Sequence, residues 1–149
     1  MSRFHSRILK ALRLEPERRR RLFVAGAAVT LIAVMLKRIG YSRTISRLSR
    51  RLPPPEETAD EAASTSRTIE RDAWAVRAAG ENLPWGSCLP RSVALWWLLA
   101  RQSIVTEIQF GVRHGDDDFS AHAWVEWRQR TISDLVDPRE LYSHLGASS

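Results

Sequence analysis

The chain has 149 residues, 44% of them apolar, which is enough for a hydrophobic core in one domain. Its single cysteine excludes an intrachain disulfide and a cysteine-rich zinc site. The net charge of +6 is uneven, because residues 1–51 hold 14 basic and two acidic residues, whereas residues 52–149 hold 9 basic and 15 acidic ones. The candidate partners of such a basic segment are anionic lipid, nucleic acid or an acidic protein face.

Two helices are predicted in the basic segment. Residues 1–15 space apolar residues at helical intervals among basic ones, which predicts a short amphipathic helix. Glu15-Pro16-Glu17 is typical of a helix start, with proline and acids in the first turn. Residues 22–36 of this second helix are uncharged and mostly apolar, but a bilayer core needs about 20 such residues. We expect a buried core helix, with membrane association through residues 22–36 as the open alternative.

The middle of the chain contains a break. A basic amphipathic pattern continues over residues 41–51, but no aromatic interleaving and no base-reading module accompany it, so no nucleic-acid partner is expected. Residues 52–66 begin with three consecutive prolines after Leu52 and are otherwise acidic and small, which predicts a linker. A helix is predicted over residues 67–80, ending at a glycine. It opens a third segment, residues 67–149.

The cysteine lies where a loop becomes an apolar helix. Pro84, Gly86 and Ser87 are turn residues, and Pro90 fits the first turn of a helix, whose N–H groups have no intrahelical partner. These N–H groups and the helix dipole favour an anion, so we expect the Cys88 thiol to ionise more readily than a free one. Cys88 is therefore a candidate nucleophile, with a small buried hydrophobic residue as the alternative.

After residue 104 the apolar period changes from 3.6 to 2, which predicts strands over residues 104–113 and 119–128. In the second strand His122 lies on the face opposite the small apolar residues. A third short strand must return antiparallel near Asp134. A three-residue turn at residues 127–129 would pair His122 with Asp134, whereas a four-residue turn would put Asp134 on the other face.

Cys88, His122 and Asp134 are of the types that nucleophilic catalysis requires. An imidazole takes the thiol proton and later protonates the leaving amine, while a carboxylate holds the ring tautomer. The backbone N–H of Cys88 is a candidate donor to the oxyanion. Asp137 is the rival for the third role, and we lean to Asp134 because the three-residue turn brings it to His122.

Three further residues are predicted to contact substrate. Trp85 lies three residues before the cysteine, and Trp124 and Glu126 share the face of the strand histidine. The chain's four histidines show no ligand spacing with the cysteine, so we expect no metal and no cofactor.

Several sequence blocks stand out, namely CLPRSVAL at residues 88–95, FGV at 110–112, FSAHAWVE at 119–126 and Ser133-Asp134. With these blocks, residues 67–145 resemble the transglutaminase-like cysteine proteases of lasso-peptide maturation, the leader peptidases called B proteins. The resemblance implies an α+β, papain/transglutaminase-like fold, with the Cys-bearing helix packed on a small antiparallel sheet.

The same resemblance implies a function and roles. The enzyme would cut the leader from a ribosomally made lasso precursor, with Cys88 as nucleophile, His122 as base and Asp134 as orienter. Residues 1–66 show no winged-helix-like leader-binding domain, so a separate leader-recognition protein is expected, together with a lasso macrocyclase. The expected location is the cytoplasm. An acyl transferase or amidase on the same triad, and a non-catalytic membrane-surface or scaffolding protein, are the alternatives.

The chain departs from the family pattern at two turns. The family often has a glycine after the Cys-bearing helix, where this chain reads Arg101-Gln102-Ser103-Ile104. The turn before the Asp-bearing strand also has no glycine in this chain. Both departures concern the local backbone geometry rather than the three catalytic residue types.

Overall fold

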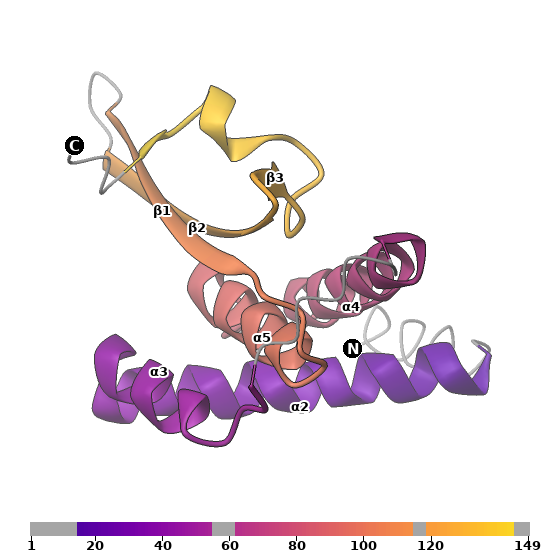
Figure 1. The fold of residues 1–149 in the computed structure, drawn as a ribbon. Coiled ribbons are helices and arrows are strands. Elements are labelled where there is room, and N and C mark those ends of the chain that lie inside the picture. The colour runs from indigo at the N-terminus through magenta and orange to yellow at the C-terminus, as the bar shows by residue number, and fades with distance from the viewer. Residues whose placement is uncertain (1–14, 55–61, 115–118, 145–149) are drawn as a thin grey trace, which may run out of the picture.

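The computed structural model describes residues 15–54, 62–114 and 119–144, with helices first and strands after them (Figure 1). The helices are α2 (Pro16–Ile39), α3 (Tyr41–Ser49), α4 (Ala62–Glu81) and α5 (Cys88–Ala100). The strands are β1 (Glu107–His114), β2 (Phe119–Trp127), β3 (Arg130–Thr131) and β4 (Ser143–His144), with the short helix η1 (Pro138–Glu140) before β4. This arrangement confirms the predicted α+β class, with the Cys-bearing helix packed on a small antiparallel sheet.

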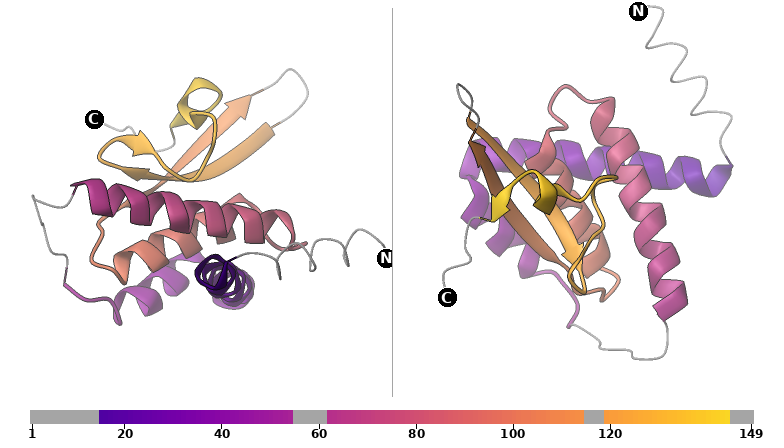
Figure 2. Two further views of the ribbon diagram at one scale, coloured as in Figure 1. Left: turned by 90° about the vertical axis from the view of Figure 1, so that its right-hand side faces the viewer. Right: turned by 90° about the horizontal axis from the view of Figure 1, so that it is seen from above.

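The elements form three layers, which are the sheet, then α4 with α5, then α2 with α3 (Figure 1 and Figure 2). Helix α5 is central, because it contacts β1 and β2 on one side and α2 on the other. Buried apolar residues from several elements fill the core, among them Val29, Ile32, Leu95, Leu99 and Val125. The core therefore includes part of the basic N-terminal segment.

Helix α2 begins where the sequence predicts, with Glu15 as its N-cap residue and Pro16 in the first turn. The residues of its inner face are nearly inaccessible to solvent, namely Ala25, Ala28, Val29 and Ile32. Its outer face carries Phe23 and Leu31, which are 65% and 50% exposed. By length and composition alone α2 is apolar enough to cross a bilayer, and 22% of its most apolar window is buried. The expectation of a core helix is thus right for one face of α2.

A buried carboxylate links α2 to the other two long helices. Asp72 of α4 is 7% exposed, and its Oδ1 accepts a hydrogen bond from Arg21 Nη1 of α2 at 2.9 Å. Its Oδ2 accepts one from Gln102 Nε2, just beyond α5, at 2.7 Å. An unpaired buried carboxylate is costly, so these bonds favour one placement of α2 against α4 and α5.

The predicted linker is longer than the one in the structure. Helix α4 begins at Ala62, so the last residues of the stretch 52–66 are helical rather than extended. Alanine, serine and threonine are compatible with a helix when the following turns pack, as Ile69 and Ala73 do here. The amphipathic helix predicted for residues 1–15 lies outside the described residues, apart from its last residue.

The sheet has the strand order β3-β2-β1-β4 and is antiparallel throughout. Strand β1 begins at Glu107, three residues later than predicted, because the end of α5 continues into a turn closed by a hydrogen bond from Ile104 N to Leu99 O, 3.1 Å. In the β1–β2 register, Gly111 lies opposite His122. This pairing determines which residues pack around the histidine.

The turn between β2 and β3 differs from both the three-residue and the four-residue turn that the sequence left open. Trp127 pairs with Arg130 and Glu126 with Thr131, which leaves a two-residue turn. Arg128 and Gln129 have φ values of 49° and 64°, as two-residue turns that match the twist of a hairpin require. The absence of glycine did not prevent this turn, because residues other than glycine can adopt positive φ at an energetic cost.

Candidate active site

The N-terminus of α5 presents the cysteine. Cys88 is the first helical residue, and its N-cap Ser87 makes no side-chain capping bond, so the first-turn N–H groups remain available to a ligand. Four residues into the helix, Ser92 Oγ donates to the Ala123 carbonyl of β2 at 2.9 Å. Because Ala123 follows His122, this buried bond holds the start of α5 beside the histidine.

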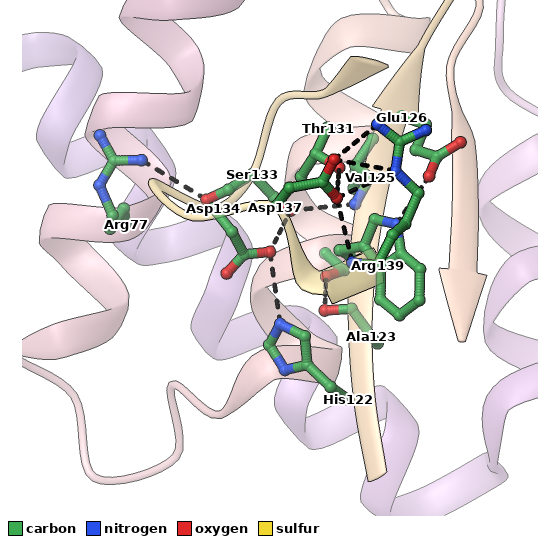
Figure 3. A network of polar contacts seen from close by, with 12 residues as sticks. Arg77, His122, Ala123, Val125, Glu126, Thr131, Ser133, Asp134, Asp137 and Arg139 are labelled. Carbon is green, nitrogen blue, oxygen red and sulfur yellow. Dashed lines mark hydrogen bonds and ion pairs between the residues drawn. The ribbon is translucent and has the colours of Figure 1, made fainter. Parts of the chain in front are cut away.

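Asp134 reaches His122 by a route that the strand register alone does not provide. Continued pairing beyond β3 would put Asp134 opposite Ala123. Instead the chain leaves the sheet after Ile132, whose N–H still donates to Val125 O at 2.9 Å. The Asp134 Oδ2 then lies 3.3 Å from His122 Nε2 (Figure 3). The predicted His122–Asp134 contact therefore exists, through an irregular segment rather than through the predicted register.

Ser133 makes this irregular segment possible. Its Oγ accepts a hydrogen bond from the Val125 N–H at 3.0 Å, which takes the place of a partner carbonyl from a neighbouring strand. The same Oγ donates to Asp134 Oδ2 at 2.8 Å, and the Ser133 carbonyl accepts from Arg77 Nη1 at 3.5 Å (Figure 3). The sequence analysis noted the Ser133-Asp134 pair and missed this positioning role.

Two aromatic rings fix the His122 imidazole. The ring of Tyr142 stacks on it with a centroid distance of 5.1 Å, and that of Trp124 lies at 6.1 Å. Gly111, opposite His122, leaves the space for both, because a Cβ there would lie 2.8 Å from the Trp124 ring and from Tyr142 Cβ. Sequence reasoning missed Tyr142, since nothing in its spacing connects it to the histidine.

Cys88, His122 and Asp134 line one narrow cleft, together with Arg77, Arg91 and other residues of α4 and α5. Its volume of about 10 Å³ is room for about one water molecule. Because His122 Nε2 contacts Asp134, the other ring nitrogen, Nδ1, is the one that can accept the proton of the Cys88 thiol. Among the described residues, no hydrogen bond joins Cys88 to His122. A larger cavity of about 400 Å³ lies between α2, α4 and α5, away from these three residues.

Burial corrects two of the predicted substrate contacts. Trp124 is fully buried and Glu126 is 8% exposed, and Trp124 Nε1 donates to Glu126 Oε1 at 2.9 Å. Neither side chain can reach a substrate, because the C-terminal segment covers the face that alternation assigned to solvent. Trp85 is 46% exposed, and its Nε1 donates to Thr30 Oγ1 of α2 at 3.0 Å.

Asp137, the rival for the third role, is engaged elsewhere. It caps η1 by accepting from the Arg139 N–H at 3.0 Å, and its Oδ2 accepts from Arg139 Nη2 at 2.6 Å. These bonds to Arg139 lower the pKa of the Asp137 carboxyl to about 2. Of the two carboxylates, the structure brings Asp134 and not Asp137 to the histidine.

A family model described as the transglutaminase-like superfamily matches residues 27–147. The chain belongs to the transglutaminase-like superfamily. The match begins inside α2, so this transglutaminase-like region includes the C-terminal half of that helix as well as the cysteine-bearing helix and the sheet. Searches of curated proteins and of solved structures found no match. In the described residues of this superfamily member, no three His, Cys, Asp or Glu side chains are grouped to hold a metal ion.

Proposed function

We propose that the chain is a cysteine peptidase that removes the leader from a ribosomally made lasso-peptide precursor. The observation that carries this proposal is that Cys88, His122 and Asp134 line one cleft at a helix N-terminus. Membership in the transglutaminase-like superfamily supports cysteine chemistry. The blocks CLPRSVAL and FSAHAWVE support the finer assignment to lasso leader peptidases.

The proposed reaction has two halves. Cys88 Sγ attacks the carbonyl carbon of the scissile peptide bond while His122 Nδ1 takes the thiol proton and Asp134 accepts the Nε2–H bond. Backbone N–H groups at the start of α5 donate to the oxyanion. The C–N bond then breaks, and the His122 proton leaves on the amine of the core peptide. Water attacks the thioester with His122 as base, which releases the leader as an acid and restores the thiol.

The family resemblance supports a separate partner. The lasso leader peptidases that the chain resembles work with a leader-binding domain, either fused or separate, and the sequence of residues 1–66 predicts none of that winged-helix-like type. We therefore infer that another protein recognises the leader and delivers the scissile bond to Cys88. The freed amine of the core peptide would then pass to a lasso macrocyclase. Both steps are expected in the cytoplasm, where the precursor is synthesised.

The test combines the full-length protein with a lasso precursor and a leader-recognition protein, and follows product masses. We expect wild-type protein to release leader and core with the mass of one added water, and Cys88→Ala to release neither. Ser87→Ala is the matched control, because Ser87 makes no side-chain cap bond, and it should stay active within about threefold. A leader joined to another amine would indicate an acyl transferase instead. Absence of any product from wild type would reject catalysis.

A further inference from the structure

The outer face of α2 carries an apolar stripe that no described residue covers. Its members recur at spacings of three and four, so we define the outer stripe as Phe23, Ala27, Leu31 and Val34. Phe23, Leu31 and Val34 are each at least half exposed. Contiguous exposed apolar surface of this kind usually marks an interaction site.

Cations continue the outer stripe at both ends. Arg20 precedes Phe23 by three residues and Arg38 follows Val34 by four, so both exposed arginines lie on the same side of α2. At a rise of 1.5 Å per residue, the line from Arg20 to Arg38 is about 27 Å long. Long basic side chains at such positions can extend from an apolar surface toward charged groups.

Among the described residues, the basic side chains around the outer stripe lack acidic partners. Residues 15–54 contain ten basic and two acidic residues, and Arg21 is already paired with Glu17 and Asp72. Within the described parts of the chain, side-chain hydrogen bonds and ion pairs are absent from Arg20, Lys37, Arg38, Arg43, Arg47 and Arg50. No described carboxylate neutralises these cations, and such a basic surface favours an anionic ligand.

We propose that the outer stripe lies flat on an anionic lipid surface. The apolar side chains enter the acyl boundary, and the cations contact lipid phosphates, which is the behaviour of in-plane interfacial helices. The opposite, buried face of α2 packs on α4 and α5, so the outer stripe faces away from these helices. The sheet lies on the far side of α4 and α5 (Figure 1 and Figure 2). Docking in this way leaves the cleft that holds Cys88 open to water-borne peptide, and it does not depend on the proposed function.

Two other arrangements of α2 fit the observations less well. Spanning the bilayer would remove Val29 and Ile32 from the core, where both are fully buried. Packing against the same stripe of a second copy would bring like charges together. In a parallel pair each arginine would face the same arginine of the second copy, and in an antiparallel pair Arg20 would face Arg38. Both arrangements bring like charges together and are unfavourable.

The test is co-sedimentation of the full-length protein with vesicles of phosphatidylcholine alone or with about one-third phosphatidylserine. We expect binding to the anionic vesicles that weakens with added salt. Phe23→Ser/Leu31→Ser should weaken it at least about 30-fold, because two exposed apolar side chains are lost. Arg20→Gln/Arg38→Gln should weaken it about 30-fold, at roughly fivefold for each cation.

Matched variants distinguish binding through the outer stripe from non-specific binding through net charge or other exposed apolar residues. Val105→Ser/Leu141→Ser removes two other exposed apolar side chains, and Arg67→Gln/Arg130→Gln removes two other exposed cations. Both should bind like wild type. No wild-type binding to anionic vesicles, or unchanged binding of Phe23→Ser/Leu31→Ser, would overturn the proposal. Insertion of the wild-type protein into membranes in a form that resists carbonate extraction would also overturn it. So would a wild-type dimer in solution that Phe23→Ser/Leu31→Ser dissociates.

Discussion

At the scale of single residues, two aspartates three positions apart have different surroundings. Asp134 Oδ2 is held 3.3 Å from His122 Nε2, and Ser133 Oγ donates to the same oxygen. Asp137 is bonded to Arg139 and Thr131. The difference comes from the backbone, which leaves the sheet beyond β3 and directs one carboxylate to the cleft and the other to η1.

Substituting each aspartate separates an orienting role from a structural one. Asp134→Asn should lower kcat for leader removal by about 10³-fold, because an amide holds the wrong imidazole tautomer. Asp137→Asn should leave kcat within about threefold at a temperature where both variants are folded. Steady-state cleavage rates measured by mass spectrometry test this. Equal losses in the two variants would contradict the assignment of Asp134.

Asp137 also gives the protein a pH dependence of stability. Its pKa of about 2 in the folded protein lies below the value of about 3.9 for an unfolded aspartate. Folding is therefore stabilised by the ionised form of Asp137. This stabilisation is complete above about pH 4 and is lost as the pH falls toward 2. Asp137→Asn should lower Tm at pH 7, and the difference from wild type should shrink between pH 4 and pH 2. Thermal melts followed by circular dichroism measure the two Tm values at each pH. A Tm difference that stays constant between pH 4 and pH 2 would contradict the prediction.

At the scale of elements, residues other than glycine form two tight connections with positive φ. Ser103 has a φ of 60° after α5, and Arg128 and Gln129 form the β2–β3 turn. Both connections lack the glycine that usually occupies such positions. Left-handed backbone costs a residue with a Cβ about 1–2 kcal/mol, so both connections carry strain that the surrounding packing offsets.

Glycine at the second turn position should relieve part of that strain. We expect Gln129→Gly to raise the free energy of unfolding by about 0.5–1 kcal/mol, after allowance for the greater freedom of glycine when unfolded. The bond from Arg139 Nη1 to the residue 129 carbonyl is a backbone contact and survives the change. Gln129→Ala, which keeps a Cβ, should show no such gain. Urea denaturation of the three proteins distinguishes them.

Gly111 is the position where β1 allows the aromatic rings to pack at the histidine. Gly111→Ala should destabilise the protein by about 1–3 kcal/mol and lower kcat, because the new Cβ displaces the Trp124 ring or Tyr142. Gly26→Ala is the control, since a Cβ there meets Ala79 Cβ at an ordinary 3.9 Å, and it should be neutral or stabilising. Thermal melts and cleavage rates test both. A tolerated Gly111→Ala would show that the rings can shift freely.

At the scale of the whole molecule, the N-terminal basic segment completes the core of the domain. Helix α2 packs on α4 and α5 through Val29 and Ile32, while Arg21 and Asp72 join the helices by an ion pair. The transglutaminase-like match also begins inside α2. Removal of this helix would expose the apolar sides of the two helices that carry and support Cys88.

Adjacent residues of α2 distinguish its two faces. Ile32 is fully buried and Leu31 is half exposed. Ile32→Ala should cost about 3 kcal/mol through lost transfer energy and a cavity, which lowers Tm by about 10 °C. Leu31→Ala should change Tm by no more than about 2 °C. Differential scanning calorimetry of the full-length variants provides the comparison, and equal losses would mean that both faces of α2 are covered.

Local chemistry made several features predictable from the sequence. Proline and acids in a first turn located the start of α2, and the loop before Cys88 located the start of α5. Strict alternation located β2 with its bounds almost unchanged. Each of these signals acts over one or two turns of chain, so neighbouring residues are enough to specify the outcome.

The tertiary structure decided the rest. Alternation put Trp124 and Glu126 on a solvent face, and the C-terminal segment that carries Tyr142 buries them. The Asp134 contact depends on a Ser133 side chain that replaces a backbone hydrogen-bond partner, which no strand pattern encodes. Both faces of α2 carry apolar residues in the sequence, and packing against α4 and α5 selects the buried one. In each case a residue distant in the chain supplies the partner, so local sequence could not reveal the result.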